Sequence, residues 1–222
     1  MDGRLHDWAI PQREYDRQLA RRGRLFAYEA LAPARAALVV VDMVPFFTRE
    51  SAYCRGIIPN INALASALRS AGGTIAWVSP APDPGSAAHA AEFFGPAVAK
   101  LFAGSGGEGA LPGRLSPELE PHAADLFCEK TAASAFFPGR SDLHERLQAL
   151  GIDTVIVTGT VTNVCCESTV RDASTLGYRV IMAADGCATV NDAMHNATLT
   201  TVYRSFGDVR PTADILGLVS AG

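Results

Sequence analysis

The sequence predicts an α/β protein, a three-layer α/β/α sandwich around a mostly parallel, doubly wound sheet. Short apolar runs rich in valine and isoleucine, typical of strands buried on both faces, alternate with amphipathic stretches at helical spacing. Each strand and helix together take about 30 residues, the length of a parallel βαβ crossover. With 222 residues and 48% hydrophobic composition, the chain can bury one large core.

Residues 1–34 are polar and rich in arginine, and we expect them to form an N-terminal extension to a domain at residues 35–222. Pro11 is placed to open a helix that runs to Arg22 and ends at Gly23. Large apolar side chains should not stay exposed in a row, so the domain or a neighbouring subunit should cover three of them. These are Trp8, Ile10 and Tyr15.

Apolar runs along the domain predict five strands and a short sixth. They lie at residues 36–41, 74–78, 125–129, 154–157, 179–184 and 207–210. Helical spacing predicts helices around residues 58–68, 90–102, 142–150, 164–176 and 192–206. The glycine-rich stretch at 104–109 follows no strand and lacks the Gly-Lys-Ser/Thr ending of a phosphate loop, so it is interpreted as a flexible loop.

Asp42, Lys130 and the segment that leads to Cys165 each come directly after a predicted strand. Cys165 follows the polar turn at 158–163. Ligands of such sheets bind outside the carboxyl ends of the strands, near the point where strand order reverses. Each residue alone has a structural interpretation, as a turn former, a solvated strand end or a small core side chain. Their joint placement at one edge predicts a site.

The three residue types suit acyl transfer from an amide. A cysteine in the first turn of a helix has its pKa lowered by unpaired backbone N–H groups, which favours the thiolate of Cys165. The ammonium of Lys130 would stabilise that thiolate. Asp42 would carry a proton to the leaving nitrogen. Free N–H groups in the preceding turn would stabilise a tetrahedral oxyanion.

Helical spacing distinguishes the two adjacent cysteines. Cys166 lines up with Val170 and Ala173 on a mainly apolar face, so it should pack in the core. Cys165 lines up with the more polar Ser168 and Asp172, which makes it the better candidate nucleophile.

The same motifs resemble those of the isochorismatase-like cysteine hydrolases, which include N-carbamoylsarcosine amidase, ureidoacrylate amidohydrolase and nicotinamidase. The resemblance rests on Val39-Val40-Val41-Asp42-Met43, on Lys130 and on the run from Thr158 to Ala173. It covers residues 34–215 and implies the α/β/α fold of that family.

The resemblance also implies roles for individual residues. It assigns Asp42, Lys130 and Cys165 to a catalytic triad that hydrolyses a C–N bond of a small amide, carbamoyl or ureido compound through a thioester. It implies a cis peptide bond between Thr160 and Val161. The backbone amides of Val161 and Cys165 would then form the oxyanion hole.

Two departures from the family pattern bear on the substrate. Val44-Pro45 stands where family members commonly have Gln-Asn beside the aspartate. Residues 79–83 read Ser-Pro-Ala-Pro-Asp where nicotinamidases carry an Asp-x-His metal motif, so we expect neither a metal nor another cofactor, and nicotinamide is disfavoured. Candidate pocket aromatics are Phe47, Trp77 and Phe137.

Other functions stay open at this point. An isochorismatase-type or lactam hydrolase and an inactive small-molecule-binding homologue share the fold. Cys165 and Arg171 have the Cys-x5-Arg spacing of cysteine phosphatases, but Glu167 in the interval and the absence of glycine disfavour a phosphate cradle. A serine hydrolase is disfavoured because no G-x-S-x-G occurs, and the dispersed histidines are interpreted as structural.

The composition indicates which kind of partner the protein binds and in which cellular compartment we expect it. A net charge of -4 from 19 basic and 23 acidic residues gives no electrostatic footprint for nucleic acid or membrane, so a small molecule is the expected partner. Five scattered cysteines indicate free thiols in a reducing compartment. With no apolar leader at the N-terminus, we expect a cytoplasmic protein. We also expect a homo-oligomer, a dimer or a tetramer.

Overall fold

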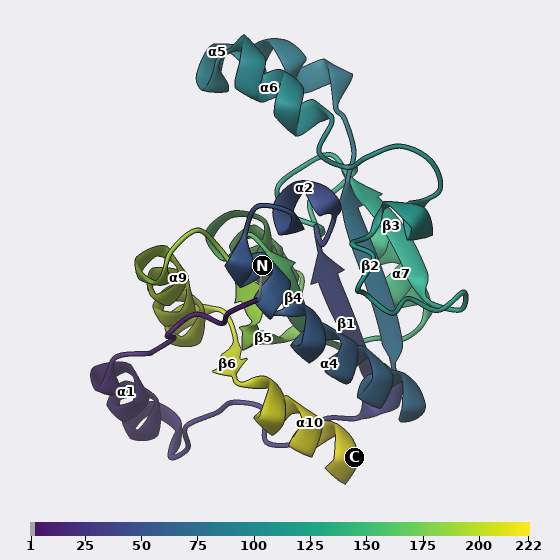
Figure 1. Ribbon diagram of the computed structural model, residues 1–222. Coiled ribbons are helices and arrows are strands. Elements are labelled where there is room, and N and C mark those ends of the chain that lie inside the picture. Colours follow the sequence, from purple (N-terminus) through teal and green to yellow (C-terminus); the bar gives the residue numbers. More distant parts are fainter. Residues whose placement is uncertain (1–2) are drawn as a thin grey trace.

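Six parallel strands form one sheet in the order β3-β2-β1-β4-β5-β6 in the computed structural model, which describes residues 3–222 (Figure 1). The strands are β1 (Ala36–Val41), β2 (Thr74–Pro80), β3 (Leu126–Lys130), β4 (Thr154–Thr160), β5 (Arg179–Ala188) and β6 (Asp208–Arg210). The chain winds from β1 out to β3 and then returns to the other side of β1. Strand order therefore reverses between β1 and β4, which confirms the doubly wound prediction.

Helices cover both faces of the sheet because alternate strand residues point to opposite sides. One face carries α4 (Ile58–Ser70) and α10 (Thr212–Ala221), which lie in front of the strands in Figure 1. The other carries α7 (Leu143–Ala149), α8 (Glu167–Thr175) and α9 (Asp192–Ser205). In β1, Val39 and Val41 belong to the core under α7–α9, whereas Leu38 and Val40 belong to the core under α4 and α10.

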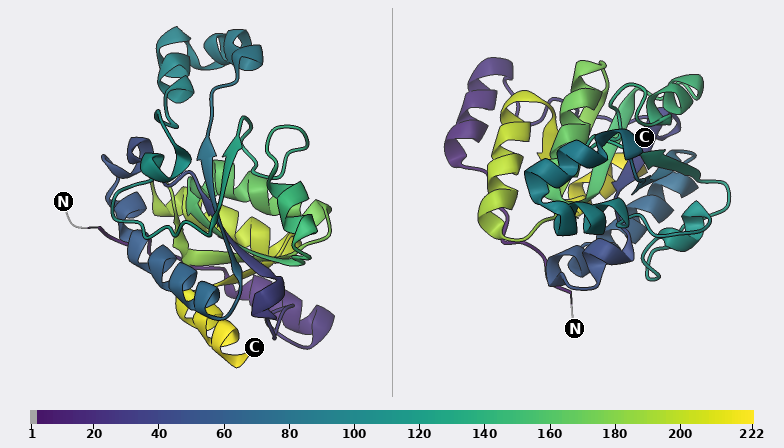
Figure 2. Two further views of the ribbon diagram at one scale, coloured as in Figure 1. Left: turned by 90° about the vertical axis from the view of Figure 1, so that its right-hand side faces the viewer. Right: turned by 90° about the horizontal axis from the view of Figure 1, so that it is seen from above.

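The expectation of a single helix at residues 90–102 is wrong. Two helices stand there, α5 (Ala87–Phe94) and α6 (Pro96–Ala103), separated by Gly95 at φ 82°, and Pro96 begins the second helix. Glycine supplies the positive φ, and the proline lacks the N–H that would continue the first helix. The resulting hairpin projects from the rest of the protein beyond the end of β2 (Figures 1 and 2).

Short helical segments join the larger elements. They are η1 (Pro33–Arg35), α2 (Pro45–Thr48), α3 (Ala52–Gly56), η2 (Pro84–Ser86) and η3 (Leu111–Arg114). None of the helices described for residues 3–222 is long and apolar enough to cross a lipid bilayer.

The strand at 154–157 continues further than the sequence predicts. Its polar continuation pairs with β1 through Thr158 and Gly159 and with β5 through Thr160. Hydrogen-bonding partners on both sides keep these residues extended, so the polar turn begins only after Thr160.

The N-terminal extension packs against the chain's own domain, as predicted. Helix α1 (Gln12–Arg22) ends at Gly23 in the left-handed conformation and lies beside α9. Trp8 and Tyr15 pack against the core under α7–α9, and Ile10 is buried within it.

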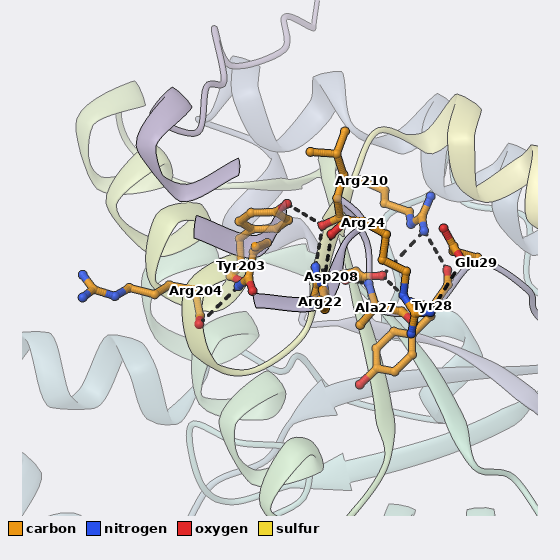
Figure 3. Close-up of polar contacts among 11 residues, drawn as sticks. Arg22, Arg24, Ala27, Tyr28, Glu29, Tyr203, Arg204, Asp208 and Arg210 are labelled. Carbon is orange, nitrogen blue, oxygen red and sulfur yellow. Dashed lines mark hydrogen bonds and ion pairs between the residues drawn. The ribbon is translucent and has the colours of Figure 1, made fainter. Parts of the chain in front are cut away.

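A buried carboxylate fastens the chain after α1 to the sheet edge (Figure 3). Asp208 in β6 accepts hydrogen bonds from the backbone N–H groups of Ala27 and Tyr28, at 2.8 and 2.9 Å. Arg210 donates to the carbonyl of Tyr28 at 2.6 Å, and Tyr203 donates to that of Leu25 at 2.5 Å. Side chains of α9 and β6 therefore hold the backbone of residues 25–28, near the end of the extension.

Candidate functional site

The side chains of Asp42, Lys130 and Cys165 meet at the carboxyl edge of the sheet. Asp42 follows β1, Lys130 is the last residue of β3, and Cys165 follows β4. Lys130 Nζ lies 2.8 Å from Asp42 Oδ2 and 3.5 Å from Cys165 Sγ. The carboxylate and the ammonium side chains are 1% and 3% exposed, so their attraction is weakly screened by water.

Lys130 is held by three partners, one for each N–H of its ammonium. Besides Asp42 and Cys165, it donates to the carbonyl of Ala132 at 3.0 Å. Burial alone would lower the pKa of Lys130, but the Asp42 carboxylate and the Cys165 sulfur raise it above its usual value. The site therefore keeps a fixed positive charge beside the sulfur.

Asp42 occupies a constrained backbone position. Its φ is 54°, a left-handed conformation that aspartate tolerates better than most residues, and its N–H donates to the carbonyl of Val78 at 2.8 Å. Burial raises the pKa of its carboxyl group, and Lys130 offsets part of that rise. Oδ1 is buried with no hydrogen-bond partner among the described residues, so one carboxylate oxygen is available to exchange a proton.

Cys165 lies in a π-helical turn, η4 (Thr162–Cys166), and not in the first turn of an α-helix as expected. The turn follows a cis peptide bond between Thr160 and Val161, where the family resemblance implies one. The Val161 carbonyl accepts hydrogen bonds from the N–H groups of Val164 and Cys166, at 3.1 and 3.2 Å. The last of these spans five residues, which is the spacing of a π-helix.

Glycine is required just before this turn. Gly159 has φ 112° and pairs with Val41, and a Cβ on it would lie 2.1 Å from the Val41 carbonyl oxygen. The missing side chain lets β4 approach β1 closely, which brings the η4 turn next to Asp42.

The thiol of Cys165 is protonated in the free site, contrary to the expectation of a lowered pKa. Burial raises the pKa of Cys165 to about 12, the negative charge of Asp42 adds to the rise, and Lys130 opposes it. A helix-start thiolate therefore does not describe this cysteine. A nucleophilic role would require this proton to leave, and Asp42 is the neighbouring group that could accept it.

Cys166 is fully buried, as its helical face predicts. Its Sγ lies 3.9 Å from the Thr158 carbonyl oxygen, in the core under α7–α9. Burial raises the pKa of Cys166 well above its usual value, which makes it a poor nucleophile.

Several polar contacts of residues 160–163 could not be anticipated from the sequence. Thr160 Oγ1 donates to the Asp42 carbonyl at 3.0 Å. Thr162 Oγ1 lies 2.9 Å from His195 Nδ1. Asn163 Oδ1 accepts from the hydroxyl of Thr189 at 2.6 Å. These partners lie 26–118 residues apart in sequence, so no local pattern signals them.

The aromatic residues expected around a pocket divide into two groups. The interpretation of Trp77 is wrong, because its side chain is 1% exposed in the core under α4 and its indole N–H donates to Asp125 Oδ2 at 2.8 Å. A side chain in the middle of a buried strand points into a layer, not toward the sheet edge. Phe47 in α2 is half-buried and Phe137 is exposed, and their role in a pocket stays a prediction.

A cleft of about 390 Å³ lies at the α5–α6 hairpin and reaches Thr131 in the loop after β3. Thr131 and Ala81 line it, and Ala81 N–H donates to the Lys130 carbonyl at 2.8 Å. An ion pair between Asp83 and Arg140 joins the base of the hairpin to that loop.

No group of three or more His, Cys, Asp or Glu side chains within residues 3–222 is arranged to hold a metal ion. The residues that gather at the sheet edge are instead an acid, a cation and a thiol.

The chain is similar in sequence and in structure to known hydrolases. The isochorismatase domain model matches residues 36–214. The chain is 31% identical over 189 residues to an uncharacterized isochorismatase family protein, YwoC of Bacillus subtilis, covering 82% of this chain and 93% of the relative. It is 29% identical over 220 residues to the ureidoacrylate amidohydrolase RutB of Agrobacterium fabrum, covering 86% and 92%. A crystal structure of a cysteine hydrolase from Pseudomonas syringae matches with a TM-score of 0.77 at 28% identity, covering 88% of this chain and 97% of that one.

Proposed function

Because the chain belongs to the isochorismatase family of hydrolases, we propose that it is a cysteine amidohydrolase that cleaves a C–N bond of a small amide, carbamoyl or ureido compound. The observation that carries the proposal is the contact of Lys130 with both Asp42 and Cys165, at 2.8 and 3.5 Å. An acid, a fixed cation and a thiol at the point where strand order reverses supply what acyl transfer needs.

In the first half of the reaction, Cys165 Sγ attacks the substrate carbonyl carbon as its proton passes to Asp42. The C–S bond forms and the carbonyl π electrons move to the oxygen. Lys130 balances the negative charge that moves through the site. Asp42 then gives the proton to the departing nitrogen, so the C–N bond breaks, the amine or ammonia leaves and a thioester remains.

In the second half, water attacks the thioester carbonyl while Asp42 takes its proton. The C–S bond breaks and the proton returns to the sulfur, which regenerates the thiol and releases a carboxylic or carbamic acid. The raised pKa of Asp42 suits a group that both accepts and returns a proton in each half. Backbone amides of Val161 and Cys165 are proposed to stabilise the oxyanion in both tetrahedral intermediates.

The similarity to RutB, which is named as a ureidoacrylate amidohydrolase, supports a ureido or carbamoyl substrate. A thiol nucleophile also favours C–N cleavage over hydrolysis of a vinyl ether, which needs no covalent acyl intermediate.

Ammonia release tests this proposal. Purified protein should release ammonia from at least one member of a panel of N-carbamoyl amino acids, ureidoacrylate and simple primary carboxamides. We expect activity to survive exhaustive chelation and to stop when iodoacetamide alkylates Cys165. Loss of turnover on chelation, with recovery on adding zinc or iron, would contradict the mechanism. Release of ammonia from none of these compounds would contradict the substrate class.

A further inference from the structure

A buried histidine from the N-terminal extension lies behind η4 (Thr162–Cys166), which is called the nucleophile turn below because it carries Cys165. The segment that carries it runs past α3 and α9 (Figure 1): Arg4 N–H donates to the Ala52 carbonyl at 3.0 Å, and Asn196 Nδ2 donates to the Asp7 carbonyl at 3.1 Å. His6 lies between these two anchors, and its side chain is 2% exposed. It precedes residue 36, where the isochorismatase domain match begins.

The ring of His6 is fixed on both nitrogens and both faces. Nδ1 lies 2.6 Å from Asp192 Oδ1, and Nε2 lies 3.0 Å from the backbone nitrogen of Thr189. Because the amide N–H of Thr189 donates, Nε2 must be the unprotonated nitrogen, and Nδ1 donates its proton to Asp192. The ring stacks on Tyr53 and on His195, with centroids 3.8 and 4.2 Å apart.

Two residues that His6 contacts, His195 and Thr189, make hydrogen bonds to the nucleophile turn. His195 Nδ1 lies 2.9 Å from Thr162 Oγ1, and Thr189 Oγ1 donates to Asn163 Oδ1 at 2.6 Å. Burial lowers the pKa of His195 to about 3, so its ring is neutral and the Thr162 contact is an ordinary hydrogen bond. Thr162 and Asn163 are consecutive residues in the same turn as the nucleophile.

We propose that His6 is a positioning residue for the nucleophile turn, acting through His195 on Thr162 and through Thr189 on Asn163. The inference rests on the proposed function only in taking Cys165 as the nucleophile. It gives the N-terminal extension a role in the reaction beyond covering the core. Within residues 3–222 neither His195 nor Thr189 makes a hydrogen bond to Asp42, Lys130 or Cys165, so the effect must pass through the backbone of the turn.

The test compares His6→Ala with Gln18→Ala, a control in the same extension. Gln18 donates a buried hydrogen bond to the Tyr203 carbonyl at 3.0 Å, away from the turn, so its loss should lower stability without moving Cys165. We expect His6→Ala to lower kcat on the order of ten- to a hundredfold with KM little changed, because small misplacements of reacting groups have such costs. Gln18→Ala should keep kcat within about twofold of wild type, measured well below each variant's melting temperature.

A second measurement needs no substrate. The rate constant for iodoacetamide alkylation of Cys165, followed by peptide mass mapping, should fall in His6→Ala and not in Gln18→Ala, because the thiol depends on an aligned Asp42 to lose its proton. The double variant Thr162→Val/Thr189→Val removes the two hydroxyls through which His6 is proposed to act. Adding His6→Ala to this double variant should therefore change kcat by less than about twofold.

The outcomes separate this inference from the proposed function. If the wild-type protein hydrolyses none of the compounds, the amidohydrolase proposal fails, and the alkylation rates still test the role of His6. If the wild type is active and His6→Ala matches Gln18→Ala in both kcat and alkylation rate, His6 is structural only and the inference is wrong. A full effect of His6→Ala in the double-valine background would also overturn it.

Discussion

Cys165→Ala should abolish hydrolysis while the protein stays folded. A thioester needs a sulfur nucleophile, which neither Asp42 nor Lys130 carries, and the neighbouring Cys166 is fully buried. We expect kcat to fall by at least about a thousandfold, the scale seen when a nucleophile is removed. Cys165 is only half-buried, so losing its sulfur should change the melting temperature little.

Cys166→Ala is the matched control for this variant. It removes a neighbouring sulfur from the core and should lower the melting temperature by leaving a small cavity, yet it should retain most of the activity. A dead Cys166 variant beside a fully active Cys165 variant would show that the nucleophile is assigned to the wrong residue.

Asp42→Asn should inactivate the protein and also destabilise it. The amide cannot accept the thiol proton, which we expect to lower kcat by about a hundred- to ten-thousandfold. It also leaves the Lys130 ammonium buried without its counter-charge, and breaking such a pair costs about 3–5 kcal/mol in the free energy of unfolding.

The double variant Asp42→Asn/Lys130→Met separates these two effects. Removing the orphaned charge should recover much of the lost stability, as seen when both members of a buried pair are replaced. Activity should not return, because the proton acceptor is still absent. Thermal melts measure the stability, and ammonia release the activity, of the wild type, of Asp42→Asn and of the double variant. Recovery of activity in the double variant would show that Asp42 serves only to hold Lys130.

The fold could be predicted because the central strands β1, β2, β4 and β5 each contain an apolar run. The run at Ala36–Val41 has no polar residue, so it fits only a strand covered on both faces, and its end at Asp42 marks the sheet edge. The break in the α5–α6 hairpin was also visible, since Gly95-Pro96 is a strong helix terminator that the helical spacing obscured. The last helix, α10, is absent from the predicted helices, although Pro211 and the apolar Ile215 and Val219 indicate it.

The triad could be predicted from its placement, but its electrostatics could not. A cysteine near a helix start suggests a lowered pKa, whereas burial dominates for Cys165 and raises it. The π-helical turn depends on the pairing of β4 with both of its neighbours, which is a tertiary effect. The contacts of His6 with Asp192 and Thr189 join residues 186 and 183 positions apart, beyond the reach of any local pattern.

The central claim is that Cys165 forms a covalent acyl intermediate. The most direct test is acid quenching during turnover of a carbamoyl or ureido substrate, followed by mass spectrometry of the peptide that contains Cys165. We expect the mass of the acyl or carbamoyl group on Cys165, present in wild type and in Cys166→Ala and absent in Cys165→Ala. A protein that turns over with no adduct, or with the adduct on another residue, would contradict it.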